Sequence, residues 1–378
     1  MNVAIFGGTF NPVHNEHINI ALAAKRELSL GKIIIMPSNI TPQKQGRLVA
    51  SATDRLNMCR LAFGGIDGAE VSDYETKKGG ISYSYLTCRE FADRYPDAQR
   101  YFIVGGDMLE CFENWKNPQE ILNCVTLAAC AREDGERLKK AAARFEEKFG
   151  KQVVIFNYVG KKVSSTRVRA LAALGESLNG LTAEKVENYI NANSVYAMPF
   201  LRKVKGLLKQ KRYEHSVRVT VTAAENCARA GVPEEKAIVA AALHDCAKEL
   251  SADSPLLKGF SLPEGVPQPV AHQYSGAFVA KNHFGVEDEE ILNAIRYHTT
   301  GRENMTPLEK LIFLADLLEE GRTYEGVEEL RKAFAASMDN GLRAALKRQV
   351  KYLESTGGKI DAHTLAALKF IEETGNDK

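Results

Sequence analysis

Histidine and aspartate residues recur through the second half of the chain at spacings that suit a metal centre. His244 and Asp245 stand together within the apolar stretch Ala240–Ala247. An ionised carboxylate in such surroundings is costly unless it is paired or bound to a metal. More donors of the same two kinds lie on both sides, far enough apart to come from separate helices: His215, His272, His298 and Asp316. Imidazole and carboxylate donors together suit iron, manganese or zinc, so the set predicts a metal centre.

Lys248 follows His244 by four residues, which would place both side chains on one face of a continuing helix. An ammonium group beside a metal could bind a substrate phosphate. A histidine taken singly would instead be read as an ordinary core or surface residue. The interpretation therefore depends on the whole set.

A second group of residues near the start of the chain could bind phosphate. The apolar run Val3–Phe6 leads directly into Gly7, Gly8, Thr9 and Phe10. Glycines there let the backbone approach a phosphate, and the helix that follows presents free N–H groups at its start. His14 and His17 are three residues apart and would share a face of that helix. They could donate hydrogen bonds to the oxygens that gain charge as pyrophosphate leaves.

A cluster of hydroxyl and guanidinium groups occupies residues 163–169, with Ser164, Ser165 and Thr166 ahead of Arg167 and Arg169. Hydroxyls at this place could cap a helix. With the two arginines they could also bind phosphates. The residues themselves leave both interpretations open.

The elements that must position these groups differ between the two halves. In the first half, apolar runs at 3–6, 32–36, 101–104, 125–129 and 153–156 alternate with helical stretches at 17–28, 53–63, 83–95 and 134–149. This alternation predicts an α/β domain with a doubly wound parallel sheet.

From residue 200 onward the pattern is helical throughout. Helices are expected at 213–229, 234–250, 270–284, 287–298, 306–320, 327–354 and 361–374, separated by glycine and proline. The second half is thus predicted to be all-α. We place the domain boundary so that residues 1–198 form one domain and residues 199–378 the other.

Composition narrows the class of partner. The chain has 50 basic and 48 acidic residues, a net charge of +2, which gives no reason to expect nucleic-acid binding. Because the chain lacks a long apolar run and an N-terminal secretion signal, no membrane partner is expected. The seven cysteines contain no Cys-x-x-Cys pair, which favours reduced thiols in the cytoplasm.

Taken together, the motifs of the first half resemble bacterial nicotinate-mononucleotide adenylyltransferase, a member of the nucleotidyltransferase superfamily with a Rossmann-like fold. Residues 7–17 resemble the opening motif Gly-Gly-Thr-Phe-Asp-Pro-x-His-x-Gly-His, and residues 163–169 resemble Ile-Ser-Ser-Thr-x-x-Arg. Ile81–Ser84, Gly105–Asp107 and Trp115 resemble weaker blocks that occur in the same order.

The resemblance implies that nicotinate mononucleotide attacks the α-phosphorus of ATP, giving deamido-NAD and pyrophosphate with Mg²⁺ on the triphosphate. It implies phosphate contacts from His14, His17, Lys44 and Arg169. The other binding residues that it implies are Gly7, Gly8, Thr9, Phe10, Ser82, Tyr83, Asp107, Trp115, Ser164, Ser165 and Thr166. Trp115 would stack on the pyridine ring, or be a half-buried interface tryptophan.

Three residues depart from this motif. Asn11 replaces an aspartate, Glu16 replaces the glycine between the histidines, and the histidine that usually precedes the lysine at 44 is missing. A carboxylate at 16 could repel a triphosphate unless it points away or is paired. One alternative is therefore a damaged adenylyltransferase.

The second half resembles the HD superfamily of metal-dependent phosphohydrolases, and within it the bacterial enzymes that split diadenosine tetraphosphate symmetrically. The resemblance implies one metal on His215, His244, Asp245 and Asp316, and a second on His272 and His298, with Asp245 bridging. The metal in that subfamily is iron, so two iron ions are expected. Lys248 and Arg322 would stabilise phosphate oxygens.

The whole chain is thus predicted to be a bifunctional cytoplasmic enzyme acting on ATP, nicotinate mononucleotide and diadenosine tetraphosphate. Its sequence leaves a homo-oligomer open. Two alternatives concern the HD half. It could be a regulatory module that senses a nucleotide, or a phosphatase for mononucleotides.

Overall fold

The computed structural model describes residues 1–40, 48–131, 135–158, 160–161 and 163–374, and the chain divides into two compact units. In the described part, the first unit holds residues 1–40, Val49–Val168 and Ser177–Tyr196. The second unit holds Leu48, Arg169–Glu176 and the chain from Ala197 onward. Lys44 lies outside the described residues.

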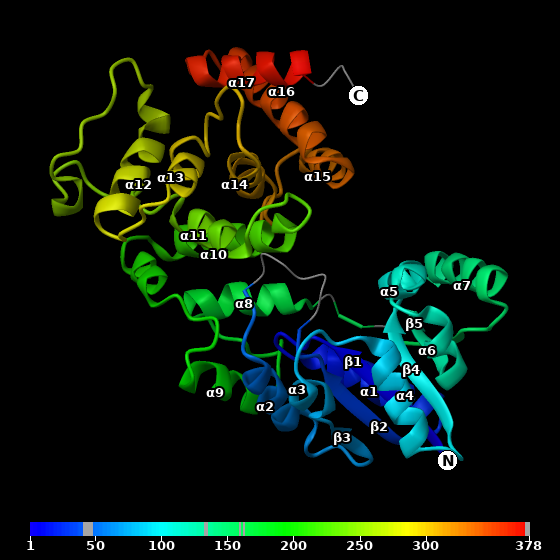
Figure 1. The fold of residues 1–378 in the computed structure, drawn as a ribbon. Helices are drawn as coiled ribbons and strands as arrows, with labels where there is room; N and C mark the ends of the chain where they lie inside the picture. The colour runs from blue at the N-terminus through cyan, green and yellow to red at the C-terminus, as the bar shows by residue number, and fades with distance from the viewer. Residues whose placement is uncertain (41–47, 132–134, 159, 162, 375–378) are drawn as a thin grey trace. The chain divides into compact units, whose positions relative to one another are not determined.

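Six parallel strands form the sheet of the first unit, in the order β3-β2-β1-β4-β5-β6 (Figure 1). The central strands are apolar along their length, as in Val3–Ile5 and Ile33–Ile35, because helices cover both faces of such sheets. The expected doubly wound sheet is confirmed. The strands are β1 (Asn2–Gly8), β2 (Leu30–Pro37), β3 (Ala69–Val71), β4 (Gln99–Gly105), β5 (Thr126–Ala131) and β6 (Val154–Asn157).

Helices connect these strands and begin near the residues of interest. The helix that follows the glycine turn is α1, and α8 begins within the hydroxyl cluster and continues into the second unit at Arg169. These helices are α1 (Asn15–Glu27), α2 (Ala52–Phe63), α3 (Tyr74–Lys78), α4 (Ser84–Arg94), α5 (Gly106–Glu110), α6 (Pro118–Cys124), α7 (Gly135–Phe149), α8 (Ser165–Leu174) and α9 (Glu184–Ala192).

The described part of the second unit is helical, as expected. Helix α10 packs along α11 and α14, and α13 packs against α12 and α14 (Figure 1). The α-helices are α10 (Gln210–Cys227), α11 (Glu234–Leu243), α12 (Ala271–Asn282), α13 (Glu289–Arg296), α14 (Pro307–Leu318), α15 (Val327–Ala336), α16 (Met338–Thr356) and α17 (Ala362–Thr374). No helix in the described ranges is long and apolar enough to cross a lipid bilayer.

Two local expectations were wrong, and one strand was missed. The helix expected over 234–250 ends at Leu243, after which the chain tightens into i→i+3 turns, such as Lys248 N–H to the Asp245 carbonyl. The helix expected over 327–354 breaks at Ser337, whose extended backbone and hydroxyl cap α16. Strand β3 was missed because a three-residue edge strand is too short for a periodic signal.

Candidate functional sites

The glycine turn of the first unit lies at the carboxyl edge of the sheet, where the strand order reverses. Strand β1 ends at Gly8 and its parallel neighbour β4 ends at Gly105. In open α/β sheets this reversal point is where ligands bind. Asp107 lies in the first turn of α5, directly after β4. The topology thus brings the glycine turn and Asp107 to the same edge.

His14 and His17 form a stacked pair at the start of α1. Their ring centroids are 3.7 Å apart with an interplanar angle of 29°. His14 is the N-cap residue, and its backbone N–H donates to His17 Nδ1 at 3.2 Å. Phe10 packs edge-on against His17 at 5.0 Å between centroids. Both imidazoles therefore stand at the positive end of a helix dipole, where an anion is favoured.

A buried arginine that the sequence analysis did not single out holds the turn in shape. Arg55 is 1% exposed, and its guanidinium donates to the backbone carbonyls of Thr9, Ser38 and Asn39 at 2.6–2.8 Å. It thereby ties the segment after β1 to the segment after β2. A lone arginine in a helix gives no sequence signal for such a role.

Two of the three residues that depart from the adenylyltransferase pattern, Asn11 and Glu16, are hydrogen-bonded, and the third lies outside the described residues. Asn11 Oδ1 accepts from Ala50 N–H at 2.9 Å and from the Tyr196 hydroxyl at 2.7 Å. Glu16 is 4% exposed and its Oε2 accepts from the Tyr158 hydroxyl at 2.8 Å and from Lys161 N–H at 2.9 Å. The Glu16 carboxylate is thus satisfied by the segment after β6.

The hydroxyl cluster divides between structural roles. Ser164 Oγ accepts from Arg167 N–H at 3.0 Å and so caps α8, while Ser165 Oγ donates to the Pro12 carbonyl at 3.0 Å. Thr166 is half-buried. Arg169 is 2% exposed and makes a two-pronged ion pair with Glu234, with both N–O distances at 2.8 Å. The guanidinium that the resemblance assigns to phosphate is therefore paired with a carboxylate, and both residues belong to the second unit.

Trp115 and the expected binding residues Ser82 and Tyr83 occupy two neighbouring segments. Ser82 Oγ accepts from Asn39 N–H at 2.8 Å, and a small open pocket is lined in part by Ser82 and Tyr83. Lys116 Nζ lies 4.3 Å from the Tyr83 ring centroid. Trp115 is half-buried and packs against Phe102 and Phe112. The Lys116 contact brings Trp115 near Tyr83 in space, although the sequence separates them by 32 positions.

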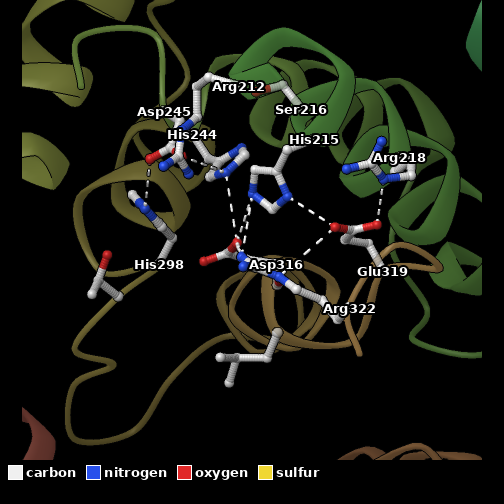
Figure 2. A network of polar contacts seen from close by, with 12 residues as sticks. Arg212, His215, Ser216, Arg218, His244, Asp245, His298, Asp316, Glu319 and Arg322 are labelled. Carbon is white, nitrogen blue, oxygen red and sulfur yellow. Dashed lines mark hydrogen bonds and ion pairs between the residues drawn. The ribbon is translucent and has the colours of Figure 1, made fainter. Parts of the chain in front are cut away.

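Five helices of the second unit, or the turns just after them, bring the predicted metal ligands together. His215 Nε2 lies 2.9 Å from Asp316 Oδ1, and His244 Nε2 lies 3.9 Å from the same oxygen (Figure 2). Asp245 Oδ1 lies 3.4 Å from Nε2 of both His272 and His298. Two sets of donor atoms are close enough to share an ion: His215, His244 and Asp316, and His244, Asp245 and His298.

All four histidines of this cluster turn Nε2 inward and point Nδ1 at an oxygen. For three of them the acceptor is the backbone carbonyl three residues earlier: Ala241 for His244, Pro269 for His272 and Ile295 for His298. His215 instead uses the Glu319 carboxylate, 3.1 Å away. A hydrogen bond at Nδ1 fixes the ring and leaves Nε2 for a metal.

Protonation states in the cluster suit a metal. Burial raises the pKa of Asp245, but His244 and His298 outweigh it and hold that pKa well below its usual value. Burial also raises the pKa of Asp316, but the hydrogen bond from His215 and the nearby histidines outweigh burial and lower that pKa. Burial, with the charges of His298 and Lys248, lowers the pKa of His272 to about 3. Ionised carboxylates and a neutral imidazole are the forms that bind metals.

Three cations contact the ligand carboxylates. Arg322 Nη2 donates to Asp316 Oδ1 at 2.7 Å, and Arg212 Nη1 donates to Asp245 Oδ2 at 2.9 Å (Figure 2). Lys248 Nζ lies 3.3 Å from Asp245 Oδ1, which it reaches from a tightened turn rather than along a helix face. Arg212 was missed because nothing in its sequence neighbourhood distinguishes it from a surface arginine.

The donor set fits a divalent ion on a structural criterion as well. His244 Nε2 and Asp245 Oδ1 are buried, and each lacks a hydrogen-bond partner in the described part of the chain. Buried polar atoms without partners are rare and call for an explanation. An ion between the imidazoles and the carboxylates would satisfy both atoms.

Comparison with known proteins finds two family domains along the chain. A cytidylyltransferase-like family model matches residues 5–171, and an HD domain model matches residues 212–321. "Probable nicotinate-nucleotide adenylyltransferase/Ap4A hydrolase" of Mycoplasma genitalium is 30% identical over 359 residues, which cover 93% of this chain and 98% of that protein. The chain belongs to the same two-domain family. The expected fusion of the two domains is thereby confirmed.

Other relatives of this chain match only one of its two halves. A probable nicotinate-nucleotide adenylyltransferase of Clostridium novyi is 34% identical over 194 residues, covering 51% of this chain and 97% of that protein. The crystal structure of a "predicted HD superfamily hydrolase involved in NAD metabolism" from Clostridium acetobutylicum has 33% sequence identity to this chain. It covers 46% of this chain and 96% of that chain, with a TM-score of 0.42.

Proposed function

We propose that the chain is a bifunctional enzyme of nucleotide metabolism. Residues 1–198 would adenylylate nicotinate mononucleotide with ATP, and residues 199–378 would hydrolyse diadenosine tetraphosphate to two ADP. The observation that supports this most directly is the relative that matches along nearly the whole chain and carries both activities in its name. The convergence of the His and Asp donors in one buried cluster supports the hydrolase half.

In the first reaction an oxygen of the nicotinate mononucleotide phosphate attacks the α-phosphorus of ATP, and the bond to pyrophosphate breaks. The stacked His14 and His17 at the start of α1 would donate to the triphosphate as charge moves onto the leaving oxygens. Mg²⁺ on the triphosphate would supply further charge neutralisation. The residues at the adjoining strand end, with Asp107 among them, would hold the adenosine.

In the second reaction water adds across the central anhydride bond, giving one ADP on each side. His215, His244, Asp245 and Asp316 would hold one ion, and His272 and His298 with Asp245 would hold a second. Two iron ions are proposed, and such ions supply Lewis acidity and lower the pKa of water. Lys248, Arg212 and Arg322 already contact the ligand carboxylates and would offset charge on the phosphate oxygens. The natural setting is proposed to be the cytoplasm.

The hydrolase half has a direct test. The full chain is purified without oxygen, loaded with Fe²⁺ and given diadenosine tetraphosphate, and the nucleotides are separated by chromatography. ADP as the sole product, lost in His244→Ala and retained in His283→Ala, is the expected result. His283 is the matched control because it is an exposed histidine of the same unit. Metal uptake with intact substrate would favour a nucleotide sensor, and turnover of mononucleotides alone would favour a phosphatase.

The adenylyltransferase half is tested by pyrophosphate release from ATP and nicotinate mononucleotide. His17→Ala is expected to lower kcat by about 10²-fold or more, the usual cost of removing a donor to a developing oxyanion. Normal pyrophosphate release by that variant would contradict the assignment.

A further inference from the structure

The ring of His215 is held from both sides by a single helix and the residue that follows it. Asp316, in α14, lies 2.9 Å from Nε2, and Glu319, directly after α14, lies 3.1 Å from Nδ1 (Figure 2). The two carboxylates are three residues apart and face the same side. One short segment therefore determines the orientation of this imidazole.

His215 needs a side-chain acceptor because it stands inside a helix. The other three histidines of the cluster lie at the start or just past the end of a helix, where backbone carbonyls are available to Nδ1. His215 lies in the second turn of α10, where neighbouring carbonyls already accept helix hydrogen bonds. A carboxylate from another helix is then the acceptor that remains.

Glu319 is itself held firmly. Its side chain is 2% exposed. Its Oε2 accepts from Arg218 Nε at 2.6 Å (Figure 2). Gly321 N–H donates to the same oxygen. Arg218 lies three residues after His215 on α10, so the same helix supplies the ring and the cation that holds its acceptor. Oε1 faces His215 Nδ1, and Arg322 Nε lies 3.8 Å from the same oxygen.

We infer that Glu319 is a positioning residue for the metal centre, fixing the ring of His215 so that Nε2 presents its lone pair to the ion. This inference rests on the metal site of the proposed function. Carboxylates in this role typically contribute a factor of 10–100 in metal affinity. Glu319 would act through His215 and touch neither the metal nor the substrate.

The test is metal binding by the full-length protein, with Co²⁺ as the probe. Co²⁺ affinity is measured by competition with a chelator, and the visible absorption of bound Co²⁺ reports its ligand geometry. Glu319→Ala is expected to raise the Kd of one Co²⁺ by about 10–100-fold and to change the spectrum. Glu319→Gln keeps an acceptor for Nδ1–H and is expected to recover part of the loss. The control is Glu328→Ala, which removes an exposed glutamate of α15 that pairs with Arg331. This variant should bind Co²⁺ like the unchanged protein.

A His215→Ala variant separates this inference from the metal site itself. If His215→Ala loses one Co²⁺ while Glu319→Ala and Glu319→Gln bind with unchanged affinity and spectrum, the metal site stands and the role of Glu319 is refuted. If His215→Ala binds Co²⁺ like the unchanged protein, the assignment of this ligand fails first. Should Glu319→Ala not fold, the Glu319→Gln affinity and spectrum decide alone.

Discussion

At the scale of single residues, Glu16 is explained by where its carboxylate points. Its Oε2 is occupied by the Tyr158 hydroxyl and Lys161 N–H, so it ties α1 to the segment that leads into the hydroxyl cluster. Gly160 fits this arrangement, because a Cβ there would lie 2.1 Å from Glu16 Oε2. Where the adenylyltransferase motif has glycine, Glu16 therefore holds two parts of the first unit together through hydrogen bonds.

We expect Glu16→Gly to lower, not raise, the adenylyltransferase activity. Loss of hydrogen bonds to a charged acceptor costs about 1.5–3 kcal/mol of stability each, so the start of α1 would be held less firmly. Misplacing the histidines by about 1 Å can lower kcat/KM for ATP by up to about 10²-fold. Steady-state kinetics of pyrophosphate release would measure it, with the exposed Glu27→Gly as control. A large rise in turnover would instead favour the damaged-enzyme alternative.

Glu75, a residue of the first unit, gives a pH-dependent prediction. Burial raises its pKa above 4.5, and the hydrogen bond from Thr87 only partly opposes this. The folded protein therefore holds the Glu75 proton to higher pH than the unfolded chain. Its contribution to stability is complete below about pH 4.5 and is lost as the pH rises through the folded-state pKa.

We therefore expect Glu75→Gln to gain stability relative to the unchanged protein as the pH rises from 4 to 7. Denaturant unfolding of the two proteins at several pH values gives the difference in free energy of unfolding. A difference that stays constant across this range would contradict the raised pKa.

At the scale of elements, α8 is a helix whose residues are divided between the two units. It begins with the capping residues of the hydroxyl cluster in the first unit, yet from Arg169 its residues belong to the second. Ala170, Ala173 and Leu174 are buried in the core of the second unit. The Arg169–Glu234 ion pair joins this helix to the start of α11, the helix that leads into His244.

Removing one partner of this buried pair should destabilise the second unit strongly. Glu234→Ala leaves a buried guanidinium without its carboxylate, which typically costs about 3–5 kcal/mol. Glu235→Ala changes an exposed neighbour and should have little effect. Denaturant unfolding followed by circular dichroism would measure both. An equal, small effect of the two variants would show that other contacts satisfy Arg169.

At the scale of the whole molecule, the two units have separate buried cores and separate chemistry. Apolar side chains of the sheet and its helices form one, and those of α10 to α17, together with the end of α8, form another. Because the predicted metal ligands all lie in the second unit, metal binding should stabilise that unit alone. A ligand at a free concentration of 100 times its Kd adds about 2.7 kcal/mol to the free energy of unfolding.

We accordingly expect two unfolding transitions in calorimetry of the full chain. Co²⁺ should raise the midpoint temperature of only one of them. His244→Ala should abolish that rise, and His14→Ala should leave it unchanged. A metal-dependent rise in both transitions would mean that the units unfold together.

The sequence by itself determined the fold class and predicted a set of metal ligands. Strand and helix periodicity reflects which faces are buried, and His244-Asp245 in an apolar stretch is unfavourable without a metal or a partner. Both signals are local, so they can be read without the fold. For the same reason the periodic signal ran through the break at Ser337 and past the end of α11 at Leu243.

Only the tertiary structure decided the residues that support these groups. Arg55, Arg212 and Glu319 act on partners 16 to 104 positions away. Tertiary packing also placed Arg169 in an ion pair with Glu234, 65 positions away. A charged side chain becomes a positioning residue through the buried partner it reaches, and that proximity is a property of packed helices and strands.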